Sequence, residues 1–163
     1  FGISKDKTNY KTIDYRLESD IAEYGYKFHM NDMNATIGLY NLPHMNDLLE
    51  KNRRNAKFFD EQLKNIEYIQ LLKVNPKCNS SFWVYSIRIL NGKKQNFIEK
   101  MKEFDIITSQ VHNRNDVNSC VKDFKEELPN LNILEKELVC IPVGWWLEEK
   151  DLQYIVKCIN KII

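Results

Sequence analysis

A helical repeat of apolar side chains between residues 45 and 66 constrains the fold of this chain more than any other feature. Apolar residues recur every three or four positions over about six helical turns, and only Asn52 breaks the series. The opposite side is charged, which is typical of a helix face in contact with solvent. The apolar positions are Met45, Leu48, Leu49, Ala56, Phe59, Leu63 and Ile66. An amphipathic helix of this length suits a spacer that joins two domains.

A shorter helix is predicted just before the long one. Residues 1–24 are polar and aperiodic, so we expect them to be irregular. Asn31 can cap a helix whose first turn carries Asp32, the charge that the helix dipole favours there. Apolar side chains occupy two sides of this helix, so we expect it to be buried between layers or at a subunit interface. Pro43 is expected to end or bend it.

The remaining residues predict a small sheet covered by helices. Strands are expected at residues 82–90, 106–111 and 138–143, with Trp83, Tyr85 and Ile87 on one side of the first. A short helix is expected around residues 97–104, a helix or turn around residues 121–128, and a final helix opens at Glu148. Pro142 places the end of the last strand at a sheet edge. This order favours an α/β fold in which helices pack on a sheet of about three strands with one buried face.

Charge and composition argue against several classes of protein. The formal net charge of +1 gives no electrostatic basis for binding nucleic acid. No apolar run approaches the ~20 residues that a membrane helix needs, and no signal-peptide pattern opens the chain. The four cysteines form no C-x-x-C pair, which favours a reducing cytoplasm, and Cys140 and Cys158 fit as small buried apolar residues. His29, His44 and His112 lack the spacing of metal ligands, so no metal site is predicted.

The first candidate binding segment is residues 25–32. It combines Lys27, His29 and Asn31 directly before a helix N-terminus, where side chains and backbone amides can meet an anion. Its aromatic content is equally compatible with a loop that packs against a neighbouring element. Local chemistry alone leaves both interpretations open.

Two further segments carry side chains that are suited to binding. His112 and Arg114 follow a predicted strand, and the planar fork of an arginine suits a phosphate or a sugar hydroxyl. The alternative for this pair is a polar surface turn. Trp145 and Trp146 follow the last strand and form either a stacking wall or, as the large apolar area of tryptophan favours, a packing contact.

These segments carry a family resemblance. Residues 25–39 read G-Y-K-F-H-M-N-D-M-N-A-T-I-G-L and resemble the G-Y-[NK]-Y-x-M-x-D-x-x-A-A-I-G-L segment of the DegT/DnrJ/EryC1/StrS aminotransferases. The opening F-G-I looks like the end of that family's R-x-F-G-I turn, and residues 112–116 are similar to its H-[YN]-R-N-D stretch. Residues 138–152 resemble the family's last strand and final helix. The likeness runs through essentially the whole chain in the right order.

The resemblance implies the C-terminal part of a fold type I transferase that depends on pyridoxal 5'-phosphate. It implies a homodimer that aminates a keto-sugar carried on a nucleotide, with glutamate as the usual amino donor, in amino-sugar and polysaccharide biosynthesis. Residues 1–44 would then close a large cofactor-binding domain and include a loop that crosses the dimer. Residues 45–66 would be the linker helix, and residues 67–163 a small C-terminal α/β domain.

The same resemblance assigns roles to individual residues. Lys27 stands where an asparagine often contacts the cofactor phosphate, and a lysine brings a full charge to that dianion. His29 stands where an arginine is common, and it is assigned with Asn31, His112 and Arg114 to the sugar nucleotide. The sequence shows no S-x-x-K followed by a G-E-G-G run, so no Schiff-base lysine and no other catalytic residue is assigned. We therefore expect this chain to be inactive alone.

Two other functions remain open at this stage. A dehydratase of the same family replaces the cofactor lysine by histidine, at a position that the resemblance puts upstream of these residues. A free-standing chain could instead be a non-catalytic module for binding or dimerisation.

Overall fold

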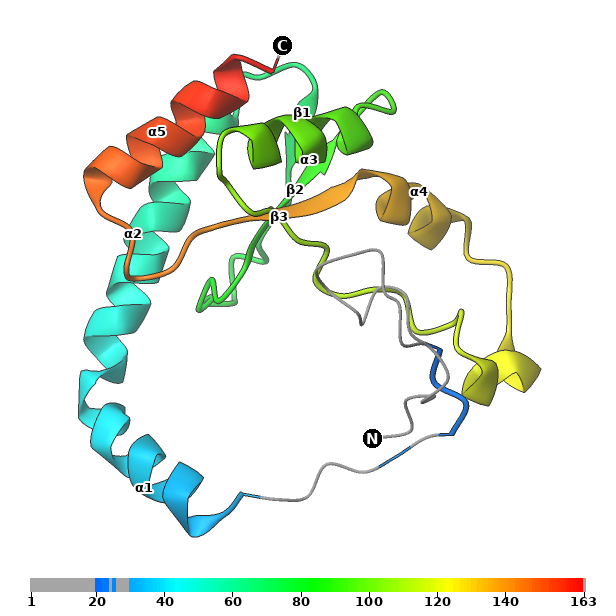
Figure 1. Cartoon of the computed structure of the whole chain (residues 1–163), viewed down its shortest axis with the longest axis horizontal. Helices are drawn as coiled ribbons and strands as arrows, with labels where there is room; N and C mark the ends of the chain where they lie inside the picture. The colour runs from blue at the N-terminus through cyan, green and yellow to red at the C-terminus, as the bar shows by residue number, and fades with distance from the viewer. Residues whose placement is uncertain (1–19, 24, 26–29, 163) are drawn as a thin grey trace.

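The computed structural model describes residues 20–23, 25 and 30–162, and Figure 1 shows their arrangement. In chain order the elements are α1 (Asp32–Asn41), the 3-10 turn η2 (Leu42–His44), α2 (Met45–Leu63), β1 (Ile69–Leu71), β2 (Tyr85–Ile89), α3 (Lys94–Glu103), the 3-10 turn η3 (Ser119–Phe124), α4 (Pro129–Glu137), β3 (Leu138–Ile141) and α5 (Glu149–Asn160). Helices and a three-stranded sheet confirm the predicted α/β lobe with its long leading helix.

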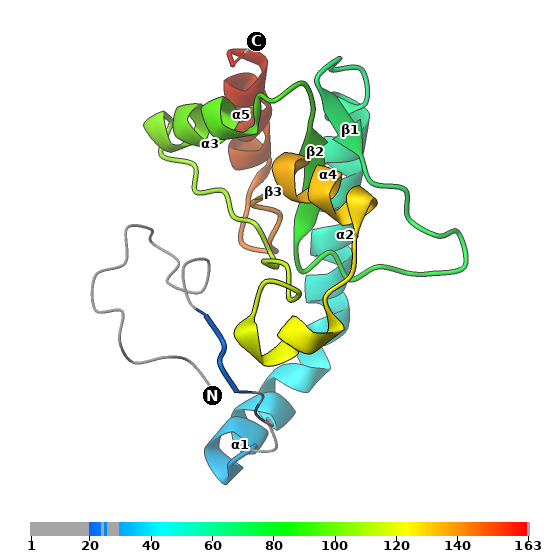
Figure 2. The same ribbon diagram turned by 90° about the vertical axis from the view of Figure 1, so that its right-hand side faces the viewer.

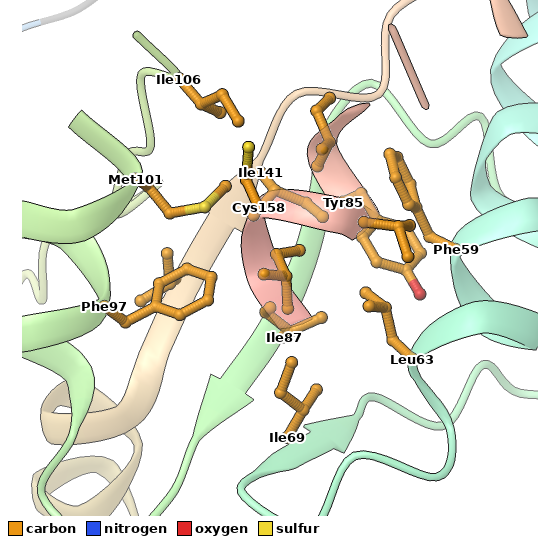
Figure 3. Packing of buried hydrophobic residues seen from close by; sticks show 14 of the residues in the cluster. Phe59, Leu63, Ile69, Tyr85, Ile87, Phe97, Met101, Ile106, Ile141 and Cys158 are labelled. Carbon is orange, nitrogen blue, oxygen red and sulfur yellow. The ribbon is translucent and has the colours of Figure 1, made fainter. Parts of the chain in front are cut away.

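The sheet is antiparallel, with β2 between β1 and β3. In β2 the residues that pair with β1 and β3 are alternately buried and half-buried, as one covered face requires. The apolar faces of α2, α3 and α5 meet this face in one continuous core (Figure 3), in which Phe59, Ile87, Phe97 and Ile159 are fully buried. Cys158 belongs to the same core and Cys140 is buried in β3, as predicted for both. α2 therefore provides one wall of the lobe with its C-terminal half.

α1 lies outside the lobe. Figures 1 and 2 show it extending from the N-terminal end of α2, away from the sheet. Asn31 caps it as predicted, because its Oδ1 accepts a hydrogen bond from the Asn34 amide at 2.8 Å. Pro43 bends the chain without ending its helical course, since η2 leads directly into α2. None of the ten residues of α1 is buried in this chain.

The first predicted strand is shorter than expected. β2 begins at Tyr85, and residues 82–84 do not belong to it. Phe82 has a φ of 45°, in the left-handed region, so an extended run cannot pass through it. Trp83 therefore does not share the buried side of Tyr85 and is 65% exposed.

The strand predicted at residues 106–111 is wrong. Only Ser109 pairs there, through an isolated bridge with Cys140 at the free edge of β3, and Ile107 is 71% exposed. The third strand is instead β1, and α4 was not predicted. β3 has its predicted place at the sheet edge, and it ends before Pro142.

Neither a membrane-spanning helix nor a cluster of metal ligands occurs among the described residues. No described helix has the length and apolar character needed to cross a membrane. Within residues 20–23, 25 and 30–162, no three histidine, cysteine, aspartate or glutamate side chains gather as metal ligands would.

Candidate functional site

A network of hydrogen bonds and ion pairs surrounds residues 104–118, the loop between α3 and η3, which we call the candidate loop. The loop first runs along β3, where Ser109 and Cys140 exchange two backbone hydrogen bonds of 3.0 and 2.6 Å. Lys94, in the first turn of α3, then holds the next residue: its Nζ donates to Oε1 of Gln110 and, at 2.6 Å, to the carbonyl oxygen of Glu135. Burial lowers the pKa of Lys94. The start of the loop is thus fixed to both α3 and α4.

Arg114 fixes the other end of the loop. Its Nε and Nη2 bind the two carboxylate oxygens of Asp116, the former at 2.7 Å, in a bidentate pair. Its Nη1 donates to Oδ1 of Asn132 at 2.6 Å and to Oε2 of Glu135 at 3.1 Å, both on α4. Its side chain is only 12% exposed.

The pKa values of this pair reflect the contacts. Hydrogen bonds to Asp116 and then to Glu135 raise the pKa of Arg114. The hydrogen bond from Arg114 is the largest cause of the lowered pKa of Asp116. Both groups are therefore held in their charged forms, and a phosphate that approached Arg114 would have to compete with two carboxylates.

His112 lies between these two fixed points and has a different environment from Arg114. It is exposed, and its imidazole lies 5.8 Å from the ring of Trp83, centroid to centroid, at an angle of 37°. Trp83 comes from the segment before β2, which Arg53 of α2 holds through a 3.0 Å hydrogen bond from Nε to the carbonyl of Ser80. The structure thus pairs His112 with an aromatic side chain that is remote in sequence.

The segment after β3 is held from the opposite side. Asn55 of α2 is fully buried, and its Nδ2 donates to the carbonyl oxygens of Val143 and Gly144, both at 3.0 Å. A Cβ on Gly144 would lie 2.1 Å from Cη2 of Trp146, so only glycine lets the indole pack on the backbone there. Trp145 meets Trp146 edge to face, with centroids 5.9 Å apart. Packing thus accounts for one face of Trp146, although both tryptophans remain exposed.

The N-terminal candidates are only partly described. Lys27 and His29 lie outside the described residues. Asn31 is exposed, and its known contact is the helix cap. Figure 1 shows α1, which Asn31 caps, on the opposite side of the molecule from α4, to which Arg114 is hydrogen-bonded.

Residues 20 and 21 are hydrogen-bonded to η3. Asp20 accepts a hydrogen bond from the Ser119 amide at 3.0 Å, and the Ile21 carbonyl accepts one from the Cys120 amide at 3.1 Å.

Sequence reasoning missed the partners of the candidate loop. Asn132 and Glu135, three positions apart on α4, face Arg114 together, and Lys94 was not considered. The available signal was weak, because a polar residue and an acid at i, i+3 define one face of a helix only if the helix is predicted.

Comparison with known proteins agrees with the family resemblance of the sequence. The model of the DegT/DnrJ/EryC1/StrS aminotransferase family matches residues 1–160. The crystal structure of the sugar aminotransferase CalS13 from Micromonospora echinospora is 33% identical, with a TM-score of 0.77 over 98% of this chain and 42% of that one. The structure of AtS13 from Actinomadura melliaura is 35% identical, with a TM-score of 0.75 over 98% of this chain and 41% of that one.

A curated relative matches over a shorter stretch. The UDP-4-amino-4,6-dideoxy-N-acetyl-beta-L-altrosamine transaminase of Campylobacter jejuni is 29% identical over 70 residues, which is 43% of this chain and 19% of that protein. The chain therefore spans less than half the length of the proteins that it matches.

Proposed function

Because this chain belongs to the DegT/DnrJ/EryC1/StrS aminotransferase family, we propose that its full-length protein aminates the keto group of a nucleotide-linked sugar with the help of pyridoxal 5'-phosphate. The observation that carries the proposal is the family match over residues 1–160, together with the likeness to a sugar aminotransferase along nearly the whole chain. Glutamate is the proposed amino donor. The proposal concerns the full-length protein, since this chain spans 42% of the length of CalS13.

Lys27 is the proposed cofactor contact of this chain. Its ammonium would bind the phosphate of pyridoxal 5'-phosphate by charge and hydrogen bonding. When bound, the cofactor supplies the electron sink through which an amino group passes from donor to sugar. The segment that carries Lys27 leads into α1, which is capped at Asn31 and buries none of its residues in its own chain. That arrangement supports the proposal that residues 25–42 form an arm that reaches a neighbouring subunit.

Dimerisation through residues 25–42 is part of the same proposal. Large apolar side chains lie exposed along α1 and its flanks, and Tyr40 is 82% exposed. A monomer rarely leaves so many large apolar side chains of one helix in water. The exposed residues are Met30, Met33, Ile37, Leu39, Tyr40 and Leu42. A second copy of the chain would cover them and would receive the Lys27 arm.

The sugar nucleotide is proposed to meet His29, Asn31 and the loop that carries His112 and Arg114. The exposed imidazole of His112 can donate or accept a hydrogen bond toward a sugar hydroxyl or a phosphate. Its position beside Trp83 supports this role, since the tryptophan limits where the imidazole can lie. These contacts would orient the keto carbon, and we assign the proton transfers to the cofactor lysine of the family, with which we match no residue of this chain.

Isotope transfer tests the reaction. The full-length protein, loaded with pyridoxal 5'-phosphate, is incubated with ¹⁵N-glutamate and a nucleotide-linked keto-sugar. An aminotransferase produces an amino-sugar that carries ¹⁵N. A product that has lost a hydroxyl and contains no ¹⁵N would show a dehydratase instead and would refute the proposal.

The role of Lys27 is tested by cofactor retention. Replacing Lys27→Ala removes a charged contact, so we expect the Kd for pyridoxal 5'-phosphate to rise about tenfold or more. Equilibrium dialysis, followed by the absorbance of the bound cofactor, measures the change. Lys27→Arg keeps the charge and should retain most of the affinity. An unchanged Kd in Lys27→Ala would exclude the phosphate contact.

A further inference from the structure

We propose that Arg114 is a positioning residue that presents His112 to the sugar nucleotide, and that it does not itself bind the substrate phosphate. This inference rests on the proposed function and revises the role that the sequence predicted for Arg114. It comes from the contacts of Arg114, which use the guanidinium on three sides within its own chain.

The donors of Arg114 face protein acceptors. Nε and Nη2 are paired with Asp116, and Nη1 is shared between Asn132 and Glu135 on α4. A fork that must bind a phosphate bidentately needs two parallel donors directed at the ligand. Here the parallel pair already faces a carboxylate, and the side chain is 12% exposed.

The charges of the cluster lead to the same conclusion. Arg114 and Lys94 bring two positive charges, and Asp116 and Glu135 bring two negative charges, so the formal sum of these four groups is zero, and Lys125 is the smallest of the influences on the pKa of Asp116. Lys94 lies in this cluster because its Nζ donates to the Glu135 carbonyl. A balanced cluster exerts little attraction on a phosphate, whereas anion sites concentrate positive potential. The geometry thus serves to hold the loop in place.

The part of the loop from residue 110 to residue 116 is held at both ends. Gln110 is bound by Lys94, and Ser109 is bound to Cys140 by two backbone hydrogen bonds. Arg114 and Asp116 fix the far end to α4. His112 is the exposed side chain midway, and Trp83 supports one side of its ring. Fixing a ligand contact in advance lowers the entropy lost on binding, which is the benefit of such a clamp.

The variant Asp116→Ala separates positioning by Arg114 from direct binding by Arg114. Asp116→Ala leaves Arg114 in place but removes its bidentate partner. If Arg114 positions His112, the KM for the nucleotide sugar should rise about tenfold, as for Arg114→Gln, because a bound conformation is lost. If Arg114 binds phosphate directly, releasing it from Asp116 should leave KM unchanged or lower it. An unchanged or lower KM overturns the proposal.

Glu137→Ala is the matched control. Glu137 lies at the C-terminal end of α4 and pairs with Arg88, and its side chain is 18% exposed, the same fraction as that of Asp116. Among the described residues, its hydrogen bond and ion pair are to Arg88 and do not reach the loop that carries His112. We expect its removal to leave the KM for the nucleotide sugar within about twofold of the wild-type value. An equal rise in KM in this control would show a general effect of weakening the lobe and would overturn the proposal.

A double-mutant cycle with His112→Ala tests whether Arg114 acts through His112. Positioning predicts that Arg114→Gln adds less than about twofold to KM once His112 is absent, whereas two independent contacts would multiply their effects. Multiplied effects would count against positioning.

Hydrogen exchange provides a readout that does not depend on activity. The hydrogen-bonded amides of Ser109 and Asn118, which lie on either side of residues 110–116, should exchange faster in Arg114→Gln and in Asp116→Ala than in the wild type, and Glu137→Ala should leave their exchange unchanged. Unaltered exchange in both loop variants would refute the clamp. Failure of the wild type to aminate any sugar would refute the proposed function and leave this measurement as the test of the clamp.

Discussion

Asn55 is the buried polar residue on which two backbone carbonyls of the described lobe depend. Its amide nitrogen satisfies Val143 and Gly144, where the chain leaves β3, and both residues are buried. A buried carbonyl without a donor is costly, so an apolar replacement cannot compensate for the lost amide. The asparagine therefore positions the segment that leads to Trp145 and Trp146 and so to α5.

We predict that Asn55→Ala destabilises the lobe by about 2–4 kcal/mol, because two hydrogen bonds are lost and two acceptors stay buried. Denaturant titration of the full-length protein measures the change. Asn52→Ala is the control one turn earlier: its Nδ2 makes a long 3.4 Å bond to Ser81, and its Oδ1 is buried without a partner among the described residues. It should cost less than about 1 kcal/mol. Equal losses would contradict the role of Asn55.

Tyr85 makes the free energy of unfolding depend on pH in the alkaline range. Burial, followed by its hydrogen bond to Asp60 at 2.7 Å, raises the pKa of the phenol above the ordinary value of 10.0. A raised pKa in the folded state means that the stabilisation is fully present below pH 10 and is lost as pH rises toward the folded value. Tyr85→Phe should therefore flatten the fall in unfolding free energy above pH 10, measured by urea titration at several pH values. A slope equal to that of the wild type would exclude Tyr85 as its cause.

Among the elements, those with a periodic apolar face were predictable. α2, α3 and α5 each place apolar residues every three or four positions against one core, so periodicity located them to within a few residues. β1 has three residues, too few for an alternating pattern, and α4 buries no residue. Polar contacts connect α4 to the rest of the lobe, such as that between Glu137 and Arg88, and hydrophobic periodicity does not report such contacts.

The candidate site was predictable to a similar degree. His112 and Arg114 were predicted to follow a strand at residues 106–111, which the structure does not have, and their neighbours were not foreseen, because Asn132 and Glu135 lie on the unpredicted α4. Residues 106–111 have the apolar content of a strand, and Ile106 is buried. Only Ser109 of this segment pairs with the edge strand β3, however, through an isolated bridge. Tertiary contacts, which local chemistry does not report, thus set the surroundings of both side chains.

The N-terminus of α5 allows a test at the scale of one element. Asp151 accepts a hydrogen bond from the Glu148 amide at 2.9 Å, at the third position of a helix that carries Leu152, Ile155 and Ile159 into the core. Asp151→Ala should cost about 0.5–2 kcal/mol, since it leaves a helix-end amide without its acceptor. Thermal melting measures the loss, and Asp151→Asn, which keeps an acceptor, should recover most of it. A melting temperature unchanged in Asp151→Ala would argue against the cap.

At the scale of the whole molecule, the described chain divides into a packed lobe and a projecting arm. One core joins the C-terminal half of α2 to the sheet, α3 and α5. α1 contributes no residue to that core, although its apolar side chains make it a poor surface to leave in water. The division predicts that changes on α1 affect assembly more than they affect the stability of the lobe.

Ile37→Glu tests this division. A charge in the middle of α1, among its exposed apolar side chains, must be desolvated if a second copy covers it, so the proposed dimer should dissociate into folded monomers. Sedimentation velocity measures the assembly state, and the far-ultraviolet circular dichroism melt checks that the lobe still folds. Gln62→Glu adds the same charge to the exposed side of α2 and should leave the dimer intact. A dimer that survives Ile37→Glu at micromolar concentration would exclude α1 from the interface, and with it the route by which Lys27 reaches a neighbouring subunit.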